Sequence, residues 1–223
     1  MKVTTDACLF GSLLPTSSRG GGIRNVLDIG TGTGLLSLMY AQKNHNARID
    51  AIEIDEDAYQ QAKENITASP WADRIEIFRG DAKEFNFPIQ YDIIISNPPF
   101  YEKELMSDDV KKNIALHNEG LLLSELLPVI KKNLKPDGLF CLLLPYKKNA
   151  EIKDLLLKHK FTILQMTFVR QSVNHDYFRI MLAGKLKMDE PPETMIDEIS
   201  IWNDKQQYSK EFIDLLKDYY LYL

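Results

Sequence analysis

Short apolar runs alternate with stretches of helical spacing along most of this chain, and this alternation constrains the fold more than any other feature. The apolar runs have the length of β-strands, and the stretches between them carry apolar residues three or four positions apart. Three consecutive isoleucines at 93–95 favour a strand buried on both faces, as in a parallel sheet. Strands are predicted at residues 26–29, 48–54, 75–78, 92–96, 139–144, 161–169 and 178–183, and helices at 6–14, 35–42, 56–67, 121–134, 149–158 and 209–223. Such units predict an α/β protein with a mostly parallel, seven-stranded sheet and helices on both faces.

A single domain is expected over residues 1–223, because a chain of this length can bury one large core without a metal or a disulfide. Three segments do not follow the alternation: residues 1–23, 101–118 and 189–223. In parallel sheets ligands bind beyond the carboxyl ends of the strands. We therefore expect 1–23 to supply an N-terminal helix and one edge of a ligand site, and 101–118 to form a substrate loop. Residues 189–223 are expected to form a C-terminal appendage, with one more candidate strand at 199–202.

The charge balance of 27 basic and 32 acidic residues, a net charge of −5, disfavours a general nucleic-acid coat protein but allows a local basic patch. Cys8 and Cys141 lie far apart, no zinc-binding spacing is present, and the four histidines do not cluster, so no metal site is predicted. The apolar runs are too short to cross a bilayer, and no secretion signal is recognisable. The expected protein is cytoplasmic and not attached to a membrane.

Residues 28–34, with the sequence DIGTGTG, follow the first predicted strand and open a helix. Glycines allow the backbone to turn sharply and approach a ligand, and the start of the helix offers unpaired N–H groups. A dinucleotide-binding loop would need its third glycine at position 35, where Leu35 stands, so a nicotinamide-dependent oxidoreductase is disfavoured. The alternation of Gly30, Gly32 and Gly34 behind Asp28 resembles the cofactor loop of S-adenosylmethionine-dependent methyltransferases. In those enzymes the leading acid and the loop amides hold the methionine end of the cofactor.

Two further acids follow predicted strands. Glu53 ends the second strand, where a carboxylate can accept hydrogen bonds from both ribose hydroxyls of a nucleoside. Asp81 follows the third strand and can accept a hydrogen bond from an adenine amino group, while Ala82 offers a backbone N–H to the ring. In series with the glycine loop, these residues predict a pocket for a nucleoside joined to an amino acid.

Residues 97–100, with the sequence NPPF, end the fourth predicted strand. Two prolines stiffen the backbone and remove two donors, so that the Asn97 side-chain oxygen and the Pro98 carbonyl form a pair of acceptors for one NH2 group. Phe100 offers a flat face to a planar substrate. An amino nitrogen on an aromatic ring is a poor nucleophile, and accepting both of its hydrogens localises electron density on it. The task of these residues is therefore alignment and charge stabilisation, with no strong base. The motif resembles the catalytic N-P-P-[FY] of amino-methyltransferases.

The resemblance extends over nearly the whole chain. Residues 2–7 (KVTTDA), the glycine loop, 69–75 (SPWADRI), 96–101 (SNPPFY), 208–209 (YS) and 220–221 (YL) look, in this order, like the bacterial tRNA-valine adenine N6-methyltransferase family. Its members modify the adenosine just 3′ of the anticodon. The resemblance implies a Rossmann-like class I methyltransferase fold with an antiparallel C-terminal strand, S-adenosylmethionine as cofactor and S-adenosylhomocysteine as product.

The resemblance also implies roles for individual residues. The catalytic residues would be Asn97, Pro98 and Phe100, with Pro99 and Tyr101 facing the substrate. The cofactor site would be lined by Thr5, Asp6, Asp28, Gly30, Gly32, Gly34, Glu53, Ile54, Asp81, Ala82 and Asn97, with Thr5 and Asp6 near the amino-acid end of the cofactor.

The tetrapeptide alone does not identify the acceptor nitrogen. Adenine in tRNA, guanine N2 in ribosomal RNA and a protein glutamine N5 are all compatible with it, and a non-catalytic RNA-binding module is disfavoured by the intact polar residues. The expected partner is tRNA, with phosphate contacts from basic residues. The candidates are Lys103, Lys111, Lys112, Lys147, Lys148 and Arg170. A monomer is expected, with a homodimer as the alternative.

Overall fold

The computed structural model describes residues 3–16, 24–99 and 121–222. Helices and strands alternate over much of the chain, as the apolar pattern predicts, but the three strands after residue 160 follow one another without a helix between them. The strands are β1 (Asn25–Ile29), β2 (Arg48–Glu53), β3 (Ile75–Arg79), β4 (Tyr91–Ser96), β5 (Leu134–Pro145), β6 (Phe161–Ser172), β7 (Tyr177–Leu186) and β8 (Met195–Trp202). The helices are α1 (Thr5–Leu13), α2 (Leu35–Lys43), α3 (Glu56–Thr67), α5 (Leu123–Asn133), α6 (Asn149–Lys158) and α7 (Lys210–Leu216), with short 3₁₀ turns at Ala72–Arg74 and Tyr146–Lys148.

All described strands join one sheet in the order β3-β2-β1-β4-β5-β7-β6-β8. The pairs are parallel except those of β7, which runs antiparallel to both β5 and β6. This confirms the predicted class I arrangement with an antiparallel strand near the C-terminus. The sheet has an eighth strand besides the seven predicted, because the candidate strand at 199–202 extends back to Met195 and pairs along β6.

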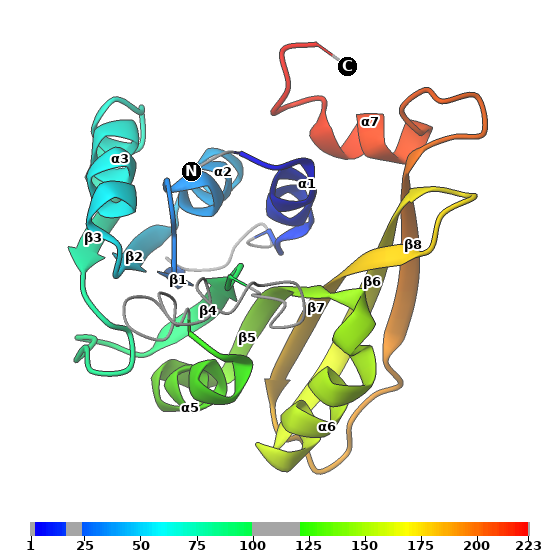
Figure 1. Ribbon diagram of the computed structural model, residues 1–223. Coiled ribbons are helices and arrows are strands. Elements are labelled where there is room, and N and C mark those ends of the chain that lie inside the picture. The colour runs from blue at the N-terminus through cyan, green and yellow to red at the C-terminus, as the bar shows by residue number, and fades with distance from the viewer. Residues whose placement is uncertain (1–2, 17–23, 100–120, 223) are drawn as a thin grey trace, which may run out of the picture.

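Two apolar cores lie on the two faces of the sheet. Helices α1, α2, α3 and α7 cover one face and α5 and α6 cover the other (Figure 1). The three isoleucines of β4 serve both cores: Ile93 and Ile95 belong to the first and Ile94 to the second, and all three are fully buried. The expectation of a strand buried on both faces is confirmed.

Helix ends follow local sequence signals. Asp55 caps α3 by accepting a hydrogen bond from the Ala58 N–H at 2.9 Å, and Ser209 caps α7 in the same way with Phe212 at 3.0 Å. The predicted C-terminal helix is shorter than its apolar spacing indicated, since α7 ends at Leu216. Phe212 and Leu216 on α7 are nevertheless fully buried against the first core.

Hydrogen bonds from Arg74 connect the C-terminal end of α2 to the start of β3. Its guanidinium donates to the carbonyls of Ala41 and Asn44, both at 2.9 Å, and to that of Ala47 at 3.3 Å. A cation at the C-terminus of a helix also complements the helix dipole. This contact gives a physical reason for the arginine in the 69–75 segment.

We expect Arg74→Met to lower the free energy of unfolding by about 2 kcal/mol, because it leaves the α2 carbonyls without a charged donor. Chemical denaturation measures this loss. Arg79→Met is the matched control, since Arg79 is exposed and its ion pair is with Glu56 at the surface, where such pairs contribute less than about 1 kcal/mol. Equal effects of the two substitutions would contradict the assigned role of Arg74.

Candidate active site

Strand register brings the glycine loop and the NPPF segment together. Ile29, the last residue of β1, pairs with Ile52 on one side and with Ser96 on the other. The Ser96 hydroxyl donates to the Ile29 carbonyl at 2.7 Å, which fixes the two strand ends relative to each other. Gly30 and Asn97, the residues that follow Ile29 and Ser96, therefore leave neighbouring strands at the same edge of the sheet.

The three glycines of the loop all need a conformation that other residues rarely adopt. Their φ angles are +69° at Gly30, +59° at Gly32 and +83° at Gly34, all in the left-handed region. A Cβ placed on Gly30 would meet nothing within 4 Å, so the space beside that residue is open. The alternating glycines thus shape a turn with room for a ligand at the start of α2.

Asp28 is fully buried behind this loop. Its Oδ2 accepts hydrogen bonds from the Thr31 hydroxyl at 2.6 Å and the Ser37 hydroxyl at 2.7 Å. Its Oδ1 is buried and has no hydrogen-bond partner in the described part of the chain. Burial raises the pKa of Asp28 to about 6, against the two hydroxyl donors, which lower it. The carboxylate keeps one acceptor atom unused, and a positively charged amino group could satisfy it.

Glu53 connects the end of β2 to the glycine loop. Its Oε2 accepts the Gly32 N–H at 2.8 Å, and its Oε1 accepts the N–H groups of Ile54 and Asp55 at 2.9 and 3.0 Å. A carboxylate has about four acceptor positions, so these bonds leave room for one more donor. Contacts to both hydroxyls of a ribose would therefore have to displace one of these three backbone donors.

The residues after β2 and β3 lie farther along the same edge. Gly80 donates its N–H to the Glu53 carbonyl at 2.9 Å, which places Asp81 and Ala82 beside the end of β2. Asp81 is half-buried and accepts the Lys83 N–H at 2.9 Å, while Ala82 is buried. Ile54 is 58% exposed at the end of β2, where it offers an apolar surface to a planar ring.

The described part of the NPPF segment follows β4 directly. Asn97 is half-buried, Pro98 is buried and Pro99 is exposed. The Asn97 side chain makes no hydrogen bond to another described residue. Phe100, Tyr101 and the expected substrate loop at 101–118 lie outside the described residues.

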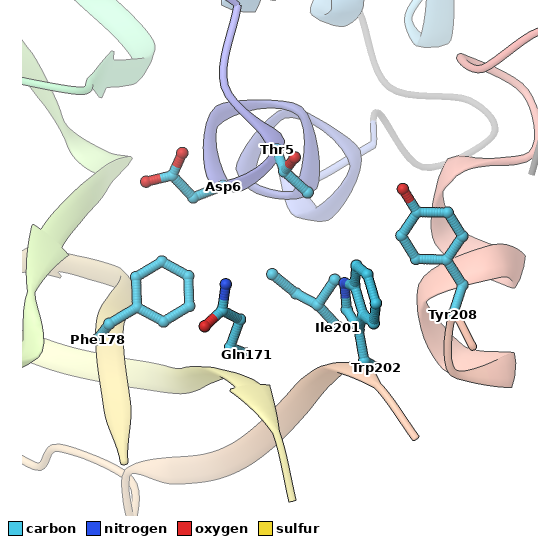
Figure 2. Close-up of a pocket in the computed structure, with 7 residues that line it drawn as sticks. All are labelled: Thr5, Asp6, Gln171, Phe178, Ile201, Trp202 and Tyr208. Carbon is cyan, nitrogen blue, oxygen red and sulfur yellow. The ribbon is translucent and has the colours of Figure 1, made fainter. Parts of the chain in front are cut away.

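Thr5 and Asp6 lie at the first turn of α1, at the other end of this edge. Asp6 Oδ2 accepts a hydrogen bond from Arg179 Nε of β7 at 2.7 Å. Burial raises the pKa of Asp6, but hydrogen bonds from Thr4 and Arg179 outweigh burial and hold that pKa below its ordinary value. In the sheet, β4 and β5 lie between β7 and β1. Both residues line a pocket with residues of β6, β7 and β8 (Figure 2), and their place at the cofactor stays a prediction.

Some contacts of the site are not evident from sequence patterns. The hydroxyls of Thr31 and Ser37 donate hydrogen bonds to Asp28. The only indication of these contacts in the sequence is the presence of hydroxyl residues inside and just after the glycine loop. Arg179 donates a hydrogen bond to Asp6. The only indication of this contact in the sequence is a charged residue inside an otherwise apolar strand. Within the described ranges no group of histidine, cysteine and acidic side chains could hold a metal ion, and no helix there is long and apolar enough to cross a membrane.

Comparison with known proteins gives a consistent result. The family model described as "Methyltransferase small domain" matches residues 7–165. A protein of Flavobacterium johnsoniae named tRNA1(Val) (adenine(37)-N6)-methyltransferase is 37% identical over 99% of this chain and 93% of its own length. A protein of the same name from Pectobacterium carotovorum is 37% identical over 100% of this chain and 88% of its own length.

Solved structures agree on the fold. A predicted O-methyltransferase from Agrobacterium tumefaciens superposes with a TM-score of 0.72 at 16% identity, covering 95% of each chain. A glycopeptide N-methyltransferase in complex with S-adenosylmethionine gives a TM-score of 0.55 at 12% identity, covering 74% of this chain and 82% of its own.

The raised pKa of Asp28 predicts a pH dependence of stability. Because the folded pKa of about 6 exceeds the ordinary 3.8, the folded protein binds this proton more tightly than the unfolded chain. The stabilisation is complete below pH 3.8 and is lost as the pH rises to 6. Relative to Asp28→Asn, the wild type should lose about 2.4 kcal/mol of unfolding free energy between pH 4 and pH 7, measured by denaturation at each pH.

Asp92→Asn is the control of opposite sign. Burial raises the pKa of Asp92, but Lys135 and the Asn25 N–H outweigh burial and hold it below its ordinary value. Relative to this variant, the wild type should gain stability as the pH rises. Wild type and Asp28→Asn curves that run parallel would show that Asp28 is not a buried carboxyl with a raised pKa.

Proposed function

Because this chain belongs to the tRNA1(Val) (adenine(37)-N6)-methyltransferase family, we propose that it transfers a methyl group from S-adenosylmethionine to N6 of adenosine 37 in tRNA1(Val), releasing S-adenosylhomocysteine. The relatives of this name match it over 99–100% of its length. The observation that carries the proposal is the pairing of Ile29 with Ser96. This pairing supports a site in which the methyl donor at Gly30 lies next to the amino group held by Asn97.

The site fits the cofactor in three respects. The open space beside Gly30 suits close approach of a ligand to the backbone, and the unpartnered Asp28 Oδ1 suits an amino group. Glu53 would hold the ribose, and Asp81 and Ala82 the adenine, at the neighbouring strand ends. When bound, S-adenosylmethionine supplies a methyl group on a positively charged sulfur, which is a good leaving group.

The contribution of this chain to the chemistry is to hold the acceptor amine. The Asn97 amide oxygen and the Pro98 carbonyl would accept its two hydrogens, which localises electron density on nitrogen as the N–C bond forms and the S–C bond breaks. The proton that the nitrogen then loses can pass to water. Fixed neutral acceptors suffice for this, because they are oriented before the reaction and need no rearrangement during it.

The comparisons favour adenine over the other nitrogens compatible with the tetrapeptide. Guanine N2 in ribosomal RNA and glutamine N5 in a protein would suit Asn97 and Pro98 equally well, but the relatives that match nearly the full chain are named for adenine 37 of tRNA1(Val). An anticodon-loop adenine is unpaired and costs less to extrude than a base in a duplex.

We propose that the enzyme works as a monomer in the cytoplasm and that phosphates of the tRNA contact basic residues near the active edge. Lys147 and Lys148 are exposed just after β5, and Arg170 lies near the end of β6 with its guanidinium 5.4 Å from the centre of the Tyr177 ring. The other three candidates lie outside the described residues.

The nucleoside product tests the function directly. The purified protein is incubated with labelled S-adenosylmethionine and total tRNA from a strain that lacks this enzyme, and the digested nucleosides are separated. We expect label in N6-methyladenosine, from valine tRNA only. Label in N2-methylguanosine, or in protein when a cell extract is supplied, would contradict the assigned acceptor.

Asn97→Ala should lower the single-turnover rate of methyl transfer by a factor of roughly 100 and leave the Kd for S-adenosylmethionine nearly unchanged, since one oriented acceptor of the transition state is lost. Glu53→Gln should have the reverse effect, weakening cofactor binding first. Asn46→Ala is the matched control, because Asn46 is exposed at the opposite edge of the sheet, just before β2. Full turnover by Asn97→Ala would overturn the assignment of Asn97.

A further inference from the structure

A pocket lies at the same edge of the sheet, beside the first turn of α1. It has a volume of about 320 Å³ and lies between the first turn of α1, the ends of β6, β7 and β8, and the residue that precedes the cap of α7. Figure 2 shows the α1 residues on one wall and the strand residues opposite them. Its lining residues are Thr5, Asp6, Gln171, Phe178, Ile201, Trp202 and Tyr208.

The position of the lining residues in the sequence suggests a role in specificity. All of them lie outside residues 7–165, the span matched by the general methyltransferase model. The tRNA-modifying relatives, in contrast, match 99–100% of this chain. The pocket is therefore built from parts that this chain has in common with tRNA enzymes in addition to the catalytic core.

The pocket is within reach of the same RNA loop as the catalytic segment. Strands β6 and β8 end, and β7 begins, at the edge where Asn97 leaves β4. With neighbouring strands about 4.8 Å apart, β7 lies roughly 10 Å and β8 roughly 19 Å from β4 along the sheet. A base within a few nucleotides of the target could reach this distance.

The chemistry of the pocket suits a flat heterocycle with polar edges. Trp202 and Tyr208 are 40% and 38% exposed, and their rings lie edge to face with centroids 5.8 Å apart. Tyr208 is held in place by stacking on Phe212 at 4.7 Å, so its ring is oriented before any ligand binds. Exposed aromatic rings of this kind stack on unpaired bases.

The polar groups of the pocket disfavour a phosphate and favour a base. The lining holds the carboxylate of Asp6 and no lysine or arginine. The exposed Gln171 side chain makes no hydrogen bond to another described residue, so its amide can offer both a donor and an acceptor. Asp6, oriented by Arg179, adds an acceptor for an amino or imino N–H.

We propose that this pocket binds one unpaired base of the tRNA anticodon loop other than the methylated adenine. The inference rests on the proposed function. Extruding the target adenine breaks its stacking on neighbouring bases, and a second base stacked on Trp202 and Tyr208 offsets part of that cost. The pocket thereby selects tRNAs by a base that is not itself modified.

The test combines protein variants with modified substrates. A set of tRNA1(Val) transcripts carries one abasic nucleotide each, at successive anticodon-loop positions other than the target. At one position the loss of the base should lower kcat/KM of the wild type roughly 5- to 100-fold, and Trp202→Ala should lower it by a similar factor on intact tRNA. On that abasic tRNA, Trp202→Ala should cause no further loss, and its Kd for S-adenosylmethionine should equal that of the wild type.

Controls make each outcome decisive. Tyr59→Ala removes an aromatic ring from another surface pocket of about 330 Å³, beside α3 and β3, and should leave kcat/KM unchanged. If melting curves show that Trp202→Ala does not fold, Gln171→Ala decides, because it removes no hydrogen bond to another described residue. The proposal would be overturned if the folded variants kept full kcat/KM or bound S-adenosylmethionine more weakly. It would also be overturned if the losses from Trp202→Ala and from the abasic nucleotide were additive at every position tested. A wild type that forms no N6-methyladenosine would instead contradict the proposed function.

Discussion

The register between β1 and β4 is the constraint on which the rest of the site depends. Gly30 and Asn97 meet because Ile29 pairs with Ser96, and the Ser96 hydroxyl bonded to the Ile29 carbonyl reinforces that pairing. A shift of one residue would turn the buried isoleucines of β4 to the opposite faces of the sheet, so two full apolar cores maintain the register. The relative position of Gly30 and Asn97 thus depends on core packing on both faces of β4.

Glu53 links the ends of β1 and β2 to the end of β3 through hydrogen bonds. By accepting the Gly32 N–H it holds the glycine loop, and its own carbonyl receives the N–H of Gly80. The ends of β1, β2 and β3 are therefore linked by bonds that converge on one buried residue. A carboxylate that already accepts three backbone donors is held in a fixed orientation, and its one remaining acceptor position can bind one hydroxyl of a ribose.

Much of the fold and of the site follows from local sequence rules, and the remainder depends on contacts between distant residues. The alternating glycines, the Asp55 cap and the three isoleucines could be predicted because each follows from backbone geometry or from burial. The start of β8 at Met195 could not, since its first four residues are all exposed, two of them are charged, and they form a strand by pairing along β6. The contact between Arg179 and Asp6 joins residues 173 positions apart, and no local pattern specifies it.

The first and last helices of the chain pack together. Leu9 of α1 and Phe212 and Leu216 of α7 belong to one core, and Gln42 of α2 donates to the Asp218 carbonyl at 2.8 Å. During synthesis the first half of the sheet can assemble while the chain is still growing. The core beneath α1, however, stays open to water until α7 has left the ribosome. A message that ends early would then yield a product with a bare apolar surface, which cellular quality control can recognise and remove.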